Sequence, residues 1–213
     1  MKYKSIWVLW ILFFTSHLSF ASDNSPAYFA EIYGYRSALN TAAMSHTFAS
    51  FYKVESDGKI TRADIGWIPQ DAYMHGWRDL KMPAFGDYPG QNLSLEDTLS
   101  RASVARPART VTRFGPYDST ETLFLKAEEQ IARLRSGSIT YRGLDMNTRP
   151  YSVNCVHAVT SMVGEFLTGL RRGPAASAGV AEFFYQTRML KSLNVNSQAY
   201  QVLHSSRPSR IIH

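Results

Sequence analysis

The chain contains a single cysteine, Cys155, among its 213 residues. One thiol cannot form an intramolecular disulfide and cannot build a zinc site from several thiolates, so the sequence excludes both of these scaffolds. Charged residues are also sparse at 19%, whereas hydrophobic residues make up 45% and aromatic residues 13%. These proportions exclude intrinsic disorder and favour a chain with a substantial buried core.

Several sequence patterns with a known function are missing. There is no internal repeat, which excludes a solenoid or a propeller. There is no G-x-G-x-x-G or Walker loop, and no RNP, zinc-finger or helix-turn-helix pattern. The formal net charge of +6 is only mildly basic, and such a balance does not by itself indicate a polyanionic partner. We therefore expect no nucleic-acid partner and no cofactor.

Residues 1–21 have the three parts of a secretory signal peptide. Lys2 and Lys4 precede an apolar block at 6–14, and Ser19 and Ala21 are small residues that suit cleavage after Ala21. A membrane-spanning helix needs ~20 apolar residues, so this block is too short to be an anchor. We expect an exported protein, periplasmic or extracellular, without a transmembrane segment after cleavage.

The rest of the chain predicts one α+β domain over residues 22–195, an antiparallel sheet with packed helices. Two segments rich in aromatic and β-branched residues, 46–54 and 60–68, flank Asp57-Gly58, a strong hairpin turn signal. Further strands are expected at 108–114 and 138–144, and helices at 28–39, 94–105, 119–136, 154–168 and 176–190. Residues 70–93 predict a long irregular loop and residues 196–213 a flexible tail.

The lone cysteine is the first candidate site residue. Cys155 follows Asn154, a favoured helix N-cap, so it would lie in the first turn of the helix predicted at 154–168. The helix dipole and the unbonded N–H groups of that turn favour a thiolate and could stabilise an oxyanion, which gives Asn154 an orienting or oxyanion role. The alternative is a buried small hydrophobe without chemistry.

A nucleophilic thiol needs a base, and His46 is the first candidate. His46 lies in the strand predicted at 46–54, on one face with Phe48 and Ser50, where it can face a helix packed on the sheet. His157 is two residues after Cys155, and side chains at that spacing on a helix point to different sides, so it would support the site. His75, in the predicted loop, stays open as a base.

No third member of a catalytic triad is clear. If the hairpin pairs Val54 with Ile60, then Ile68 faces His46, and an isoleucine cannot orient an imidazole. Asp64 would face Ser50, too far along the strand at ~3.4 Å per residue. The third residue could be Asp64 in another register, Gln70 or Asp71, or it could be absent.

The segment Asn154-Cys155-Val156-His157-Ala158 resembles the N-C-x-H signature of permuted papain-like thiol enzymes, the relatives of NlpC/P60 and lecithin retinol acyltransferase. With His46-Thr-Phe, Trp67-Ile-Pro69 and Gly115-Pro-Tyr117, it is similar to a group of exported bacterial proteins of unassigned function. The similarity spans about residues 43–165. It implies a papain-like fold with Cys155 as nucleophile and His46 as general base. Val156 and Ala158 depart from the acyltransferase pattern, which has an acid and an aromatic residue there.

Three further features have two interpretations each. His46, His75, His157 and Cys155 could bind a metal, but they lack the spacing of any known metal motif, so we expect none. Trp67 and nearby aromatic residues could line a cleft for an acyl chain or a sugar, or could pack in the core. The arginines between residues 101 and 113 could form an anion-binding groove or a solvated face.

The leading hypothesis is an exported cysteine-dependent hydrolase that acts on an amide or ester, or an acyltransferase, through a thioester on Cys155 with His46 as base. Export and the resemblance suggest a peptidoglycan peptide or a lipid acyl group as substrate. The alternative is a non-catalytic envelope binding or structural module with the same fold. The sequence does not specify the bond cleaved or the oligomeric state.

Overall fold

The structure, a computed structural model, describes residues 25–36, 45–70, 86–104, 110–143, 151–166 and 173–206. The predicted signal peptide at 1–21 and the candidate residues Asp71 and His75 lie outside these ranges, as do Arg106 and Arg109. In the part of the chain that is described, no helix has the length and hydropathy to cross a membrane.

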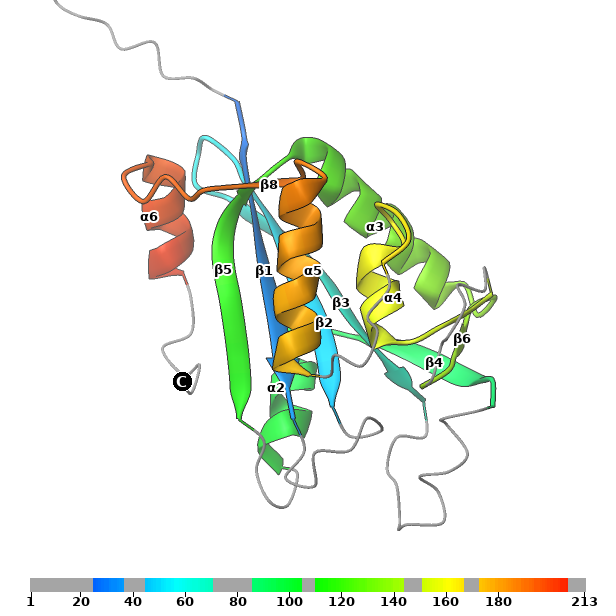
Figure 1. Ribbon diagram of the computed structural model, residues 1–213. Helices are drawn as coiled ribbons and strands as arrows, with labels where there is room; N and C mark the ends of the chain where they lie inside the picture. The colour runs from blue at the N-terminus through cyan, green and yellow to red at the C-terminus, as the bar shows by residue number, and fades with distance from the viewer. Residues whose placement is uncertain are drawn as a thin grey trace, which may run out of the picture.

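The protein folds as an α+β domain around an eight-stranded sheet with the order β7-β6-β4-β3-β2-β1-β5-β8 (Figure 1). Neighbouring strands are antiparallel except for the parallel pair β6–β7. The α+β class is therefore as predicted, but the sheet is mixed and not purely antiparallel. The strands are β1 (Ala27–Tyr35), β2 (His46–Val54), β3 (Ile60–Pro69), β4 (Tyr88–Leu93), β5 (Val111–Ser119), β6 (Thr140–Tyr141), β7 (Ser152–Val153) and β8 (Leu190–Lys191).

Helices cover both faces of this sheet. They are α2 (Leu95–Val104), α3 (Glu121–Arg135), α4 (Cys155–Thr160), α5 (Pro174–Gln186) and α6 (Gln198–Ser205). Figure 1 shows α3, α4 and α5 over one face, and their side chains form the largest apolar cluster with Ile32, Phe51 and Ile65 of the sheet. We call this the helical face. The opposite face, which we call the α2/α6 face, carries two smaller clusters under α2 and α6.

The central hairpin has the register that the sequence predicts. Val54 pairs with Ile60, and Ser50 pairs with Asp64. Gly58 has a φ of +84° and donates its N–H to the Glu55 carbonyl. A left-handed residue suits glycine, so the Asp57-Gly58 signal fixes both the turn and the pairing of β2 with β3.

The predicted helix at 28–39 is wrong, because residues 27–35 form strand β1 in the middle of the sheet. Side chains at 29, 31, 33 and 35 point to the α2/α6 face, and those of Ala30 and Ile32 point to the helical face. Both faces of β1 are covered, so its sequence lacks the apolar–polar alternation that marks a half-exposed strand.

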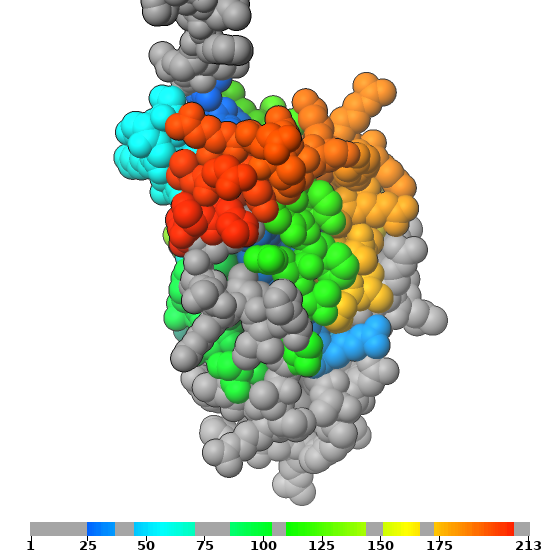
Figure 2. Space-filling model, turned by 90° about the vertical axis from the view of Figure 1, so that its left-hand side faces the viewer, coloured from blue at the N-terminus to red at the C-terminus, as the bar shows by residue number. Residues whose placement is uncertain are grey.

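The predicted flexible tail at 196–213 contains helix α6 instead. Ser197 caps this helix by accepting the Tyr200 N–H, and Leu203 is buried against Phe29 and Val54. Figure 2 shows α6 lying next to the β2–β3 hairpin turn, where Val202 is the nearest side chain to Gly58. The contacts that order α6 come from strands far away in the sequence, which explains why a local reading missed it.

Other predicted elements differ mainly in length. The helix expected at 154–168 is α4, which ends at Thr160, and the loop expected at 70–93 contains β4. The helix expected at 119–136 is α3, and Thr120, not Ser119, is its N-cap. Gly90 of β4 is required by a close approach, because a Cβ there would lie 2.0 Å from the Trp67 ring.

Candidate functional site

Cys155 is the first residue of α4, as the sequence predicts. The Asn154 side chain accepts a hydrogen bond from the His157 N–H at 2.8 Å, which confirms the predicted N-cap. Just before the cap, the Trp67 indole Nε1 donates to the Val153 carbonyl at 3.1 Å. The start of α4 is therefore tied to strand β3, and the position of the thiol is determined by the sheet.

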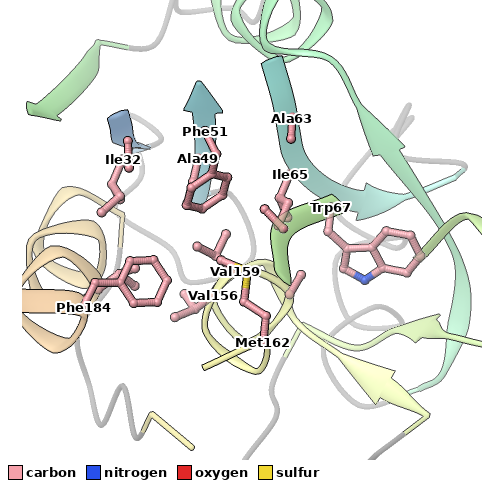
Figure 3. Close-up of a cluster of buried hydrophobic side chains, with 14 of the residues drawn as sticks. Ile32, Ala49, Phe51, Ala63, Ile65, Trp67, Val156, Val159, Met162 and Phe184 are labelled. Carbon is pink, nitrogen blue, oxygen red and sulfur yellow. The ribbon is translucent and has the colours of Figure 1, made fainter. Parts of the chain in front are cut away.

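The thiol belongs to the apolar cluster of the helical face. Figure 3 shows Val156, Val159 and Met162 of this segment among the sheet side chains Ala49 and Ile65, with Phe184 to one side. Cys155 is a member of the same cluster and is 8% exposed. Apolar surroundings favour the neutral thiol, whereas the N-terminal end of a helix favours the thiolate. Burial and the helix therefore have opposite effects on the ionisation of Cys155.

His46 is the first residue of β2 and is 4% exposed. Its ring stacks on the Phe48 ring at 5.4 Å between centroids and contacts the Tyr35 ring at the same distance. Phe48 and Tyr35 belong to the cluster under α2. The His46 side chain therefore lies on the α2/α6 face, whereas Cys155 packs on the helical face. On β2, Thr47 and Ala49 occupy the side that faces the helix with Cys155, whereas the expectation placed His46 on that side.

The two residues nevertheless lie at the same end of the sheet. The β2–β3 ladder ends with the pair Ala49 and Ile65, and Thr47 and His46 of β2 and Trp67 of β3 lie beyond that pair. Trp67 is bonded to Val153, which lies two residues before Cys155. The start of α4 thus lies at the end of the sheet at which β2 begins.

Tyr141 is a site residue that sequence reasoning missed. It pairs with Val153 in the parallel β6–β7 ladder and packs against the cluster that contains Cys155. Burial raises the pKa of the Tyr141 phenol, and the neighbouring Cys155 and Tyr35 groups raise the pKa further. Tyr141 thus places a neutral hydroxyl near the thiol. One tyrosine in a short predicted strand carries no sequence signal for that role.

Asp64 does not orient His46, which corrects one predicted role. Asp64 pairs with Ser50, which lies four residues along β2 from His46, a distance of ~13 Å at the rise of a strand. Its carboxylate accepts hydrogen bonds from the Ser50 hydroxyl at 2.8 Å and from the Leu95 N–H at 2.9 Å. Asp64 therefore fixes the start of α2 on the sheet. Burial raises its pKa, and these bonds with the nearby Arg62 partly oppose that rise.

Trp67 is a core residue and not a substrate-binding one, which corrects a second predicted role. It is fully buried, its indole N–H is used by Val153, and its ring lies against Gly90. Gln70, another candidate for the third catalytic residue, is exposed, and its backbone carbonyl accepts from the Gln91 side chain.

His157 bonds away from Cys155, as predicted. Its ring Nε2 lies 2.9 Å from the Phe166 carbonyl, and the residue is buried. This bond ties α4 to the segment that follows it. Within the described ranges there is no group of three or more histidine, cysteine or acidic residues that could hold a metal ion. Of the arginines between 101 and 113, Arg113 lies 3.8 Å from the Glu31 carboxylate.

Comparison with known proteins assigns neither a family nor a function to this site. No family model matches the chain, and neither a curated protein nor a solved structure matches it.

Proposed function

We propose that this chain is an exported cysteine-dependent hydrolase or acyltransferase of the permuted papain-like type, with Cys155 as nucleophile and His46 as general base. The observation that supports this best is the position of Cys155, the first residue of a capped helix that is packed on β2 and β3 at the end of the sheet where the strand with His46 begins. A helix start favours the thiolate, which is the reactive form.

The reaction would run through a thioester. The sulfur attacks the carbonyl carbon of an amide or ester while the His46 imidazole takes the thiol proton, and the proton then goes to the leaving amine or alcohol as its bond breaks. Water, or a second acceptor alcohol or amine, resolves the thioester. His46 and Cys155 pack in clusters on opposite faces, so this step requires that the two side chains meet at the end of the sheet. Export and the sequence resemblance favour a peptidoglycan peptide or a lipid acyl group as substrate.

A second candidate function is a non-catalytic envelope binding or structural module with the same fold. Two observations favour it. Cys155 and His46 are both buried and lie on opposite faces of the sheet. The β2–β3 ladder ends before His46, and Ile68, which the predicted register places across from it, is a buried apolar residue that cannot orient an imidazole.

The pH dependence of Cys155 alkylation separates the two functions, because Cys155 is the only cysteine in the chain. If the thiol is activated by His46, iodoacetamide should label the native protein rapidly at about pH 6, where an ordinary thiol is protonated. His46→Gln should abolish this labelling, whereas the control His204→Gln, at an exposed position on α6, should leave it unchanged.

Labelling of the native wild-type protein that is no faster at about pH 6 than for a free thiol would contradict the enzyme. Labelling that appears only on unfolding would favour the non-catalytic module. As a direct check, release of an amine from a peptidoglycan peptide or of a fatty acid from an acyl ester should be lost in Cys155→Ala.

A further inference from the structure

The C-terminal end of the helix that carries Cys155 is completed partly by backbone groups and partly by another helix. α4 spans six residues, and so short a helix is marginal without outside contacts. The carbonyls of His157 and Thr160 accept backbone N–H groups from the turn that follows. The Ala158 carbonyl of α4 and the Met162 carbonyl of that turn instead accept hydrogen bonds from side chains of α3, since the last carbonyl groups of a helix have no intrahelical donors.

Gln130 is the main donor. It is 3% exposed, and its Nε2 donates to the Ala158 carbonyl and to the Ser161 hydroxyl, each at 3.0 Å. Its Oε1 accepts from Arg133 Nη1 at 3.1 Å, so both ends of the amide are used. A buried amide that lacked partners would be costly, and α4 supplies the partners that make a glutamine suitable there.

Lys126 lies one helical turn before Gln130 and acts on the same end of α4. Its Nζ donates to the Met162 carbonyl at 3.0 Å. Residues four apart lie on one side of a helix, so α3 presents two donors side by side, and a cation suits the negative end of a helix dipole. The other buried positions of α3, such as Ala127 and Ile131, pack in the apolar cluster.

We propose that Gln130, assisted by Lys126, is a positioning residue that holds Cys155 in place by closing the C-terminal end of α4. The inference rests on the proposed function only for the statement that Cys155 is the nucleophile. Without the Gln130 donor, α4 opens locally and exposes Cys155 while the sheet remains folded. With the donor present, Asn154 at one end and Gln130 at the other keep the thiol at the end of the sheet.

The test is native-state alkylation of Cys155 in Gln130→Met, which keeps the side-chain length and removes the donor. The matched control is Gln186→Met, at an exposed position of α5 where the amide bonds only to Glu182 of its own helix. Iodoacetamide labelling is followed at increasing urea below the unfolding transition. We expect Gln130→Met to raise the labelling rate about tenfold, since a buried acceptor loses its partner, and Gln186→Met to leave it unchanged.

The dependence on urea distinguishes positioning from a general loss of stability. Local opening exposes little surface, so the labelling rate in Gln130→Met should change little with urea, whereas global unfolding would make it rise steeply. The pH profile of labelling should also move towards that of an unstructured cysteine. A rate that rises with urea as steeply as global unfolding, or no acceleration at all, would overturn the proposal.

Lys126→Met provides the same test if Gln130→Met fails to fold, because Lys126 is only half-buried. It should also accelerate labelling without urea dependence, by a smaller factor. The two proposals fail separately. If Cys155 in the wild-type protein is labelled with the pH profile of an ordinary thiol, its proposed role as nucleophile is contradicted. The urea dependence of labelling in the variants alone decides whether Gln130 positions α4.

Discussion

The two faces of the sheet are buried by different kinds of contact. The helical face is apolar throughout its centre, where Ile32, Phe51 and Ile65 meet the side chains of α3, α4 and α5. The α2/α6 face carries a row of polar groups across the middle of the sheet, because Glu31 pairs with Ser50 and Ser50 pairs with Asp64. One face is held mainly by close packing, whereas the other combines two smaller apolar clusters with hydrogen bonds and charge.

Glu31 is the centre of that polar row. It is 1% exposed and accepts hydrogen bonds from the Tyr33 hydroxyl at 2.5 Å and the Tyr52 hydroxyl at 2.9 Å. Arg113 Nη1 lies 3.8 Å from its other oxygen. Burial, and next to it the Glu31 charge, raises the pKa of both tyrosines, which therefore remain neutral donors.

The difference between the faces shows why titratable residues alone do not locate a site. On the α2/α6 face, the carboxylate of Glu31 is hydrogen-bonded to two tyrosines, and that of Asp64 is hydrogen-bonded to the start of α2. The thiol lies on the other, apolar face, together with Tyr141. A catalytic partner for Cys155, the nucleophile that we propose, would therefore lie at the end of the sheet, where the two faces meet.

The largest expected effect is on the polar face. Glu31→Ala leaves two buried hydroxyl groups and a nearby guanidinium without their acceptor, so we expect it to lower the free energy of unfolding by about 3–5 kcal/mol. Urea unfolding measures this loss. The control Glu129→Ala, at an exposed position on α3, should stay within about 0.5 kcal/mol of the wild type. Equal losses in the two variants would contradict the assigned role of Glu31.

A smaller effect is expected for Tyr52→Phe, at about 1–3 kcal/mol, because one buried hydrogen bond to Glu31 is lost. The pKa of Tyr52 in the folded state lies above its ordinary value of 10.0, so above pH 10 the unfolded state loses the proton first. The stability contribution is complete below that pH and falls as the pH rises beyond it.

Tyr52→Phe should therefore make the alkaline decline of stability shallower, as measured by urea unfolding at a series of alkaline pH values. Tyr151→Phe, at an exposed position, is the control and should keep the wild-type slope. An unchanged slope in Tyr52→Phe would mean that burial of this phenol does not couple folding to pH.

The smallest effect is expected on the helical face. Ile65→Val removes one methylene from a fully buried side chain, which costs about 0.5–1.5 kcal/mol. The loss should be the same at neutral and at alkaline pH, because the substitution removes no titrating group and no hydrogen bond. A loss that depended on pH would show that the two faces are energetically coupled through the sheet.

The features predicted correctly from the sequence are those that depend on neighbouring residues. The Asp57-Gly58 turn specifies the pairing of β2 with β3, and Asn154 specifies where α4 begins. Strand β1 and helix α6 were missed, because both are formed by contacts with segments far away in the chain. The predicted roles of Asp64 and Trp67 failed for the same reason, since each has a partner, Leu95 and Val153, that no local pattern reveals.

The sequence by itself determined that His46 shares a face of β2 with Phe48 and Ser50, because side chains alternate along any strand. It also determined that Cys155 starts a helix, because Asn154 caps the N–H groups of the first turn. Only the tertiary structure decided that α4 packs on the opposite face from His46. That choice depends on which apolar surfaces of α3, α4 and α5 fit together over the sheet, and close packing is a property of the whole core.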